Sequence, residues 1–153
     1  MESIKGISLH YYKYSESSVI AKIFTENYGL QSYVIKGIRN KTSKNKLSYL
    51  HPLNIVSLEI SVNKNKGLPF VKEIRSEHNL SSTYSDMQKK FVCMFISEVL
   101  MRVLMEKETD KKLYNFSEKT ILYLNKTEEL NKNFVLVFLL FNGIWCGSTS
   151  TLY

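Results

Sequence analysis

Apolar and polar residues alternate along the first half of the chain, and the spacing of the apolar residues lengthens in the second half. Between residues 7 and 11 every second position is apolar, which is the two-residue period of a half-buried strand. Further strands are predicted over residues 19–24, 30–38, 53–62 and 70–74. Gly29 ends the short polar segment between the second and third strands, where we expect a tight turn with a positive φ.

Five short strands within the first 76 residues predict a small β-barrel. A long polar connection separates the third strand from the fourth, as is typical of the five-stranded Greek-key barrel that binds oligonucleotides, the OB-fold. We therefore expect an α+β protein, with an OB-fold nucleic-acid-binding domain over residues 1–78 and an α-helical domain over residues 82–153.

From about residue 85 onward the apolar residues follow helical spacing. The sequence Ser85-Asp86-Met87-Gln88 has the pattern of a capping box and predicts the start of a helix that continues to Leu104. A second helix is predicted from near Asp110, and a third from near Thr127, with Phe134 and Phe141 among its apolar residues. The segment around residues 79–82 is interpreted as a short link between the two domains.

The surplus positive charge of the chain lies entirely in its first half. Residues 1–76 contain 12 Lys and Arg against 5 Asp and Glu, a net charge of +7, whereas residues 77–153 contain 9 against 9. Five of the eleven residues of the 36–46 segment are basic and none is acidic. A local charge of this kind is typical of a surface that binds a polyanion.

Tyrosines flank and neighbour this basic segment, so we expect it to bind single-stranded nucleic acid. Lysine and arginine would neutralise phosphates, and each ring stacked on a base would contribute about 1–3 kcal/mol. Because 18 of the 21 basic residues are Lys, we expect contacts with phosphates rather than with base edges. The candidate site consists of Lys36, Arg39, Lys41, Lys44, Lys46, Tyr33 and Tyr49.

The sequence gives little support for catalysis, a metal site or a membrane segment. His10, His51 and His78 have no Cys, Asp or Glu at metal-ligand spacing, and the six glycines form no phosphate-binding loop. The two cysteines are far apart, which favours a reduced cytosolic compartment. We therefore expect a non-enzymatic protein without a cofactor, a signal peptide or a membrane contact.

Six groups of residues follow one another in a specific order through the first half of the chain. They are Lys5-Gly6-Ile7-Ser8-Leu9, Tyr14-Ser15-Glu16-Ser17-Ser18, Phe24-Thr25-Glu26 with Gly29-Leu30, Val34-Ile35-Lys36-Gly37-Ile38-Arg39, Leu50-His51-Pro52-Leu53 and Val71-Lys72-Glu73. In this order they resemble the amino-terminal domain of the bacterial RecO recombination mediators over residues 3–75, and the helical half fits that family more loosely.

The resemblance implies an OB-fold followed by helices, in a cytoplasmic, nucleoid-associated protein of bacterial recombinational DNA repair. It implies annealing of complementary single strands and assistance in loading RecA onto strands coated by single-strand binding protein. Its partners would be single-stranded DNA, RecR and the acidic carboxy-terminal tail of that coating protein. By position, Lys36 and Arg39 would touch DNA, whereas Lys41, Lys44 and Lys46 are candidates from their charge alone.

Family members continue well beyond this length, and many carry a four-cysteine zinc module in that further part. The residues after Phe141 do not resemble a continuing family helix, so we expect an incomplete helical domain in a truncated or frame-shifted chain. Two other functions stay open at this point. One is a general OB-fold module that binds RNA, and the other is a protein-interaction scaffold whose charge only aids solubility.

Overall fold

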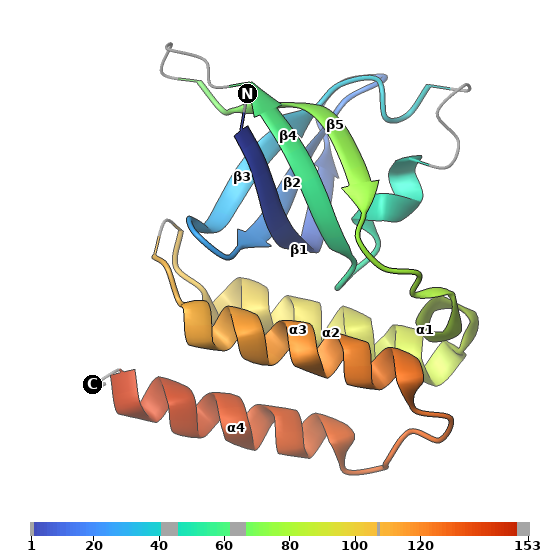
Figure 1. Cartoon of the computed structure of the whole chain (residues 1–153), viewed down its shortest axis with the longest axis vertical. Coiled ribbons are helices and arrows are strands. Elements are labelled where there is room, and N and C mark those ends of the chain that lie inside the picture. Colours follow the sequence, from blue (N-terminus) through green and yellow to red (C-terminus); the bar gives the residue numbers. More distant parts are fainter. Residues whose placement is uncertain (1, 41–45, 62–66, 107, 150–153) are drawn as a thin grey trace.

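Five strands of the first half close into a barrel in the computed structural model, which describes residues 2–40, 46–61, 67–106 and 108–149, with side chains as far as Phe141 (Figure 1). The strands follow one another around the barrel in the order β1-β2-β3-β5-β4, and β4 pairs with β1. The β3–β5 contact is parallel and the other pairs are antiparallel. The strands are β1 (Glu2–Lys13), β2 (Val19–Thr25), β3 (Gly29–Ile35), β4 (Ile55–Ser61) and β5 (Phe70–Ser76).

The five strands and the OB-fold are confirmed, but some strand ends differ from the prediction. β3 ends at Ile35 rather than at residue 38, because Gly37 adopts a φ of 69° and turns the chain. Leu53, predicted to start the fourth strand, has a φ of 65° and lies before β4. A short 3₁₀ helix, η2 (Lys46–Leu50), lies within the long connection predicted between the third and fourth strands.

β1 is longer than predicted, and a bulge within it allows the strand to pair with two neighbouring strands. Its first part pairs with β4 and its second part with β2, and the register shifts between Ser8 and His10. The bulge bends the strand around the barrel, so the same strand closes the barrel and forms the β1–β2 hairpin.

The helices are α1 (Ser81–Ser85), α2 (Met87–Val103), α3 (Lys111–Lys126) and α4 (Phe134–Thr149). Asp86, not Ser85, caps α2, since its side chain accepts hydrogen bonds from the backbone N–H of Gln88 and Lys89. α3 begins beside Asp110 as predicted, and the Asp110 side chain caps it by accepting a hydrogen bond from the backbone N–H of Leu113. The third predicted helix begins at Phe134 rather than near Thr127, because Thr127 is extended and ends α3. Among the described residues, no helix is long and apolar enough to cross a membrane.

Two hydrophobic cores hold the fold together. The first fills the barrel with inward residues of every strand. In the second, outward residues of the barrel, including Ile7, Phe24 and Leu30, pack against α2 and α3. Figure 1 shows the resulting layers, with α2 and α3 lying across one end of the barrel and α4 beyond α3. The division near residues 79–82 stays a prediction, and the shared core packs the two parts against each other.

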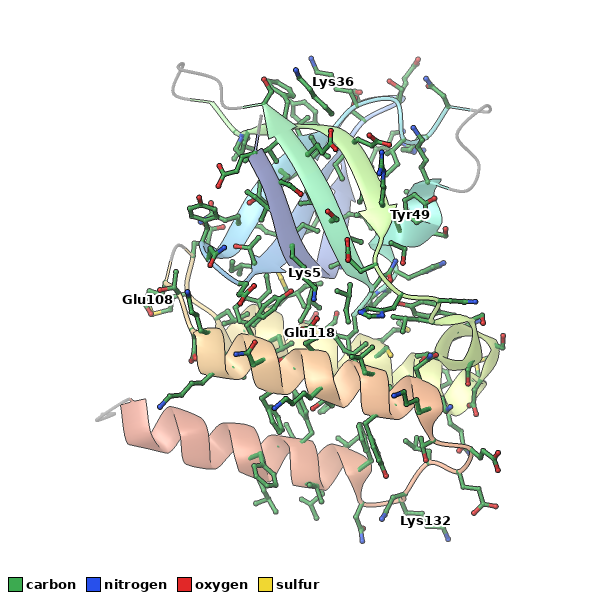
Figure 2. The ribbon with its side chains drawn as sticks, viewed as in Figure 1. Lys5, Lys36, Tyr49, Glu108, Glu118 and Lys132 are labelled. Atoms are coloured by element: carbon green, nitrogen blue, oxygen red, sulfur yellow. The ribbon has the colours of Figure 1, made fainter. Side chains whose placement is uncertain are left out.

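Ion pairs between the barrel and the helical half neutralise some of the positive charge of the barrel. Lys5 of β1 forms an ion pair with Glu118 of α3 (Figure 2). Lys22 of β2 forms another with Glu106, which follows α2. The Ser97 hydroxyl donates a hydrogen bond of 2.8 Å to the carbonyl oxygen of Leu9. Two lysines of the basic half are thus paired with acids of the neutral half, so the free positive charge is concentrated elsewhere on the barrel.

Candidate nucleic-acid interface

The barrel has one end covered by helices, and Lys36 and the β1–β2 loop lie at its opposite end (Figure 2). Backbone hydrogen bonds join two segments there. The N–H of Arg39 donates to the carbonyl oxygen of Ser17 at 3.2 Å, and its guanidinium Nη1 donates to that of Ser15 at 3.3 Å. These bonds bring Arg39 to the β1–β2 loop, although 24 residues separate it from Ser15. We call this region the open end of the barrel.

Lys36 lies at the open end in a defined position. It follows β3 directly, its side chain is exposed, and its Nζ lies 4.2 Å from the centroid of the Phe70 ring on the neighbouring strand β5. A lysine ammonium over an aromatic face is attracted by the electron density of the ring. The contact gives this flexible side chain a preferred location while leaving it open to solvent.

The other predicted basic residues differ in their surroundings. Lys46 is exposed at the start of η2, and its positive charge contributes to lowering the pKa of Glu73. The negative charge of Glu73 close by weakens the electrostatic attraction between Lys46 and a phosphate. Lys41 and Lys44 lie outside the described residues, so the structure brings together Lys36 and Arg39 from the predicted set.

The expectation for Tyr33 was wrong. Its ring is 2% exposed inside the barrel core, where burial raises the pKa of its hydroxyl to about 12. A ring enclosed by the strands has no free face for a base, so Tyr33 stabilises the barrel instead. Tyr49, on η2, is half-buried against the same core and presents only part of its surface.

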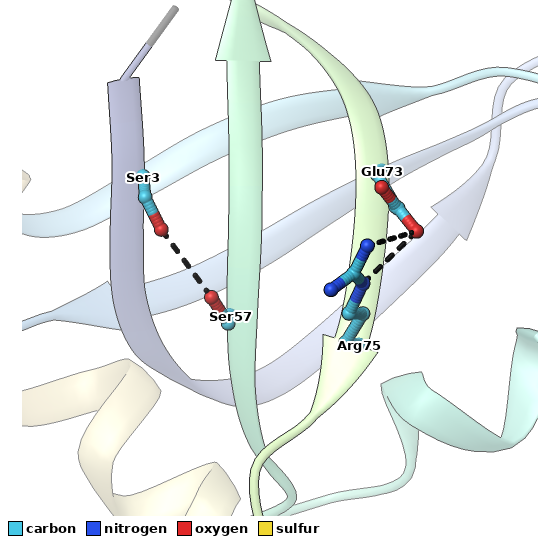
Figure 3. A network of polar contacts seen from close by, with 4 residues as sticks. All are labelled: Ser3, Ser57, Glu73 and Arg75. Atoms are coloured by element: carbon cyan, nitrogen blue, oxygen red, sulfur yellow. Dashed lines mark hydrogen bonds and ion pairs between the residues drawn. The ribbon is translucent and has the colours of Figure 1, made fainter.

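The surface formed by the first part of β1, by β4 and by β5 around Glu73 is unsuited to a polyanion, because acids lie on it. Glu59 and Glu73 are directly opposed on β4 and β5. Figure 3 shows Glu73 paired with Arg75 at 2.9 Å, while the Ser3 and Ser57 hydroxyls lie 3.5 Å apart on β1 and β4. The hydrogen bond from Arg75 lowers the pKa of Glu73 and keeps its carboxylate charged. This side of the barrel would repel phosphates more than the side formed by β2 and β3, which contain no acid.

Exposed aromatic residues at the open end were not among the predicted site residues. Tyr12 and Tyr14, at the end of β1, have 49% and 63% of their surface exposed, and Phe70 is half-buried beside Lys36. The alternating pattern of the sequence marks Tyr12 as a strand residue but does not show which face of the strand stays open. Phe70 is too distant in sequence from the basic segment for the sequence alone to predict that the two lie side by side.

The helical layer carries a separate apolar groove between α3 and α4. It has a volume of about 420 Å³. The ring of Tyr123 stacks on that of Phe134 with centroids 6.0 Å apart, and Lys119 lies at the groove. Among the described residues, no three His, Cys, Asp or Glu side chains are placed to hold a metal ion.

Comparison with known proteins points to one family. A family described as "Recombination protein O N terminal" matches residues 1–79. The protein named DNA repair protein RecO in Flavobacterium psychrophilum is 35% identical over 138 residues, which cover 89% of this chain and 57% of that protein. The proteins of the same name in Flavobacterium johnsoniae and Azobacteroides pseudotrichonymphae are 33% and 30% identical, over 89% and 88% of this chain. The chain spans 57% and 56% of their lengths, little more than half.

Proposed function

Because this chain belongs to the RecO family, we propose that it binds single-stranded DNA at the open end of its barrel and anneals complementary strands in recombinational DNA repair. The observation that carries the proposal is the meeting of Lys36, Arg39 and the β1–β2 loop at the end that the helices leave uncovered. The OB-fold commonly binds oligonucleotides with its second and third strands and the loops beside them. In this chain the same strands contain no acid.

The proposed role is non-enzymatic. A cationic surface lowers the repulsion between two phosphate backbones, so a protein that holds two complementary strands increases the frequency of productive encounters. Neither strand needs a bond made or broken for this. The free energy comes from counterion release on binding and from base pairing after it.

The direct test mixes complementary labelled single strands with the protein and follows duplex formation by energy transfer. We expect faster annealing than in protein-free mixtures at low salt, and a loss of that acceleration as salt rises. A Lys36→Gln/Arg39→Gln variant should anneal more slowly. The matched control, Lys126→Gln/Lys132→Gln, removes two exposed lysines from the helical layer and should anneal like the unsubstituted chain. Annealing no faster than without protein would overturn the proposal.

Two alternatives have their own readouts. Competition between RNA and DNA strands of one sequence separates a general RNA-binding module from a DNA-binding one, since only a contact with the 2′-hydroxyl favours RNA. Replacement of Lys36, Arg39, Lys41, Lys44 and Lys46 by Gln tests the scaffold alternative. Nucleic-acid binding that survives this replacement unchanged would support a scaffold whose charge aids solubility.

A second binding role concerns the helical layer. We propose that the groove between α3 and α4 holds the acidic tail of single-strand binding protein, and that this contact assists RecA loading together with RecR. Support comes from the aromatic lining of the groove and from Lys119 beside it, which suit a peptide with apolar and acidic residues. Lys119→Gln should weaken binding of a labelled tail peptide. Lys126→Gln on the same helix, outside the groove, is the matched control.

A further inference from the structure

A row of four residues crosses the outer surface of the barrel from β1 to β5. Tyr12 pairs with Ile20, Ile20 with Val34, and Val34 with Phe70. Directly paired residues on neighbouring strands point to the same face of a sheet. The adjacent core residues Ala21, Tyr33, Ile35 and Val71 lie inside the barrel, so the row points away from that core. Tyr12 is exposed, Ile20 and Phe70 are half-buried, and Val34 between them is only 4% exposed.

The row begins and ends with an aromatic ring, and its length suits a short stretch of single strand. Three inter-strand spacings of about 4.8 Å separate the ends, or about 14 Å along the surface. That distance corresponds to about four nucleotides at the stacked spacing of 3.4 Å, and to fewer in a stretched strand. Tyr12 and Phe70 can therefore contact different bases of one bound strand.

Both rings are placed before any ligand arrives. The His10 ring meets the Tyr12 ring edge-on with centroids 4.6 Å apart, which restricts the rotation of a side chain that is otherwise 49% exposed. The Phe70 ring has one face turned toward the Lys36 ammonium. Lysine has a long flexible stem, so its ammonium can move to a phosphate and leave this face to a base.

Charge favours a nucleic acid on this face over the neighbouring one. The acids Glu59 and Glu73 are opposed on β4 and β5, and Glu73 lies three residues along β5 from Phe70, away from the row. On the outward face of β2, Glu106 is engaged in an ion pair with Lys22. A strand along the row would thus pass Lys36 without meeting the opposed carboxylates.

We propose that Tyr12 and Phe70 are base-stacking residues of the proposed DNA-binding surface, and that Lys36 binds a phosphate of the stacked segment. This inference rests on the proposed function and names the side chains that would contact bases. Stacking has little dependence on base identity, because every base has an aromatic face. The row would therefore hold single strands of any sequence and leave their hydrogen-bonding edges available for pairing.

The test combines protein variants with strands that lack bases. Fluorescence anisotropy measures binding of a thymine-only oligonucleotide and of an abasic strand with the same number of phosphates. Tyr12→Leu and Phe70→Leu should each weaken binding of the thymine strand by about five-fold or more. Binding of the abasic strand should stay unchanged. Equal losses on both strands, or a loss on neither, would overturn the inference.

Controls separate this inference from the proposed function and from misfolding. Tyr12→Phe retains the ring and should restore binding of the thymine strand. Tyr28→Leu removes a tyrosine of similar exposure, 43%, on the β2–β3 turn and should bind both strands like the unsubstituted chain. Unchanged thermal unfolding shows that each variant folds. If the unsubstituted chain bound neither strand, the proposed function itself would fail, which differs from a chain that binds both strands without using the rings.

Discussion

The ammonium of Lys36 lies 4.2 Å from the centroid of the Phe70 ring, across the parallel contact between β3 and β5. At an exposed site such a contact contributes about 0.5–1 kcal/mol, enough to bias the position of a lysine without fixing it. Lys36 is therefore held near the open end of the barrel and stays available to a phosphate. The pair joins one end of the basic segment to a ring that lies 34 residues further along the sequence.

Removing Lys36 or Arg39 should change how DNA binding depends on salt. Each phosphate contact on a single strand contributes about 0.7 to the slope of log K against log salt concentration. Lys36→Gln and Arg39→Gln should each reduce that slope by about this amount, as measured by anisotropy titrations over a series of salt concentrations. Lys126→Gln should leave the slope unchanged. A variant of Lys36 with the original slope would show that this lysine does not contact phosphate.

Gly29 should be intolerant of any side chain. Its φ is 65°, and an added Cβ would lie 1.9 Å from the backbone oxygen of Glu108, which is too close for any accommodation without backbone movement. Gly29→Ala should lower the free energy of unfolding by about 2–4 kcal/mol in urea titrations. Gly67→Ala, where an added Cβ meets no atom within 4 Å, should change it by less than about 0.5 kcal/mol. Similar losses in the two variants would contradict this account.

Tyr114 should tolerate loss of its hydroxyl. Its ring is fully buried against Phe24, with centroids 5.4 Å apart, but its hydroxyl has no hydrogen-bond partner among the described residues. Tyr114→Phe should leave the free energy of unfolding unchanged or raise it by up to about 1 kcal/mol. Tyr84→Phe removes a hydroxyl that donates to the Pro52 carbonyl oxygen and should lower it by about 0.5–1.5 kcal/mol. A larger loss for Tyr114 would reveal a partner for its hydroxyl.

The free energy of unfolding should fall at alkaline pH, because a buried thiol and a buried tyrosine hydroxyl with raised pKa values release their protons on unfolding. Burial raises the pKa of the Cys93 thiol to about 12, from 9.0 for an exposed thiol. The unfolded chain releases this proton at lower pH than the folded chain. The stabilising contribution of the thiol to the free energy of unfolding is therefore complete below about pH 9 and is lost progressively toward pH 12. Tyr33, whose pKa is also about 12, acts in the same direction.

Urea unfolding at several pH values measures this loss, and Cys93→Ala provides the comparison. The variant lacks the thiol and should lose less stability between about pH 9 and pH 12 than the unsubstituted chain. In a Cys146→Ser background, the Cys93 thiol should also resist a thiol reagent at neutral pH until the protein is unfolded. Rapid modification of the folded chain would contradict the burial of this thiol.

The alternation of residues in β3 could be predicted from the sequence because it is local. The two-residue alternation over residues 30–38 predicts Val34 and Lys36 on one face and Tyr33 with Ile35 on the other, and the burial of Tyr33 and Ile35 in the barrel core agrees with this division. Periodicity separates two faces but does not tell which one is enclosed when the sheet closes into a barrel. Tyr33 was therefore predicted as a stacking residue, although closure places its face inside.

The tertiary structure also decided which residues stand beside the basic segment. The bulge between Ser8 and His10 shifts the register of β1 and places Tyr12 on the outer row. The parallel contact between β3 and β5 brings Phe70 to Lys36. Both relationships depend on strand pairing over long sequence separations, which no local pattern encodes.

The sequence by itself determined the succession of five strands and then helices, the helix starts near Asp86 and Asp110, the turn at Gly29 and the excess of positive charge in the first half. These properties follow from local spacing, backbone preferences and composition. Only the tertiary structure decided where that charge acts. Folding pairs Lys5 with Glu118 and Lys22 with Glu106 across the two halves of the chain, and it leaves Lys36 and Arg39 at the open end. Electrostatic interactions depend on the distance between charges in space, and the folding of the chain rather than the order of its residues sets that distance.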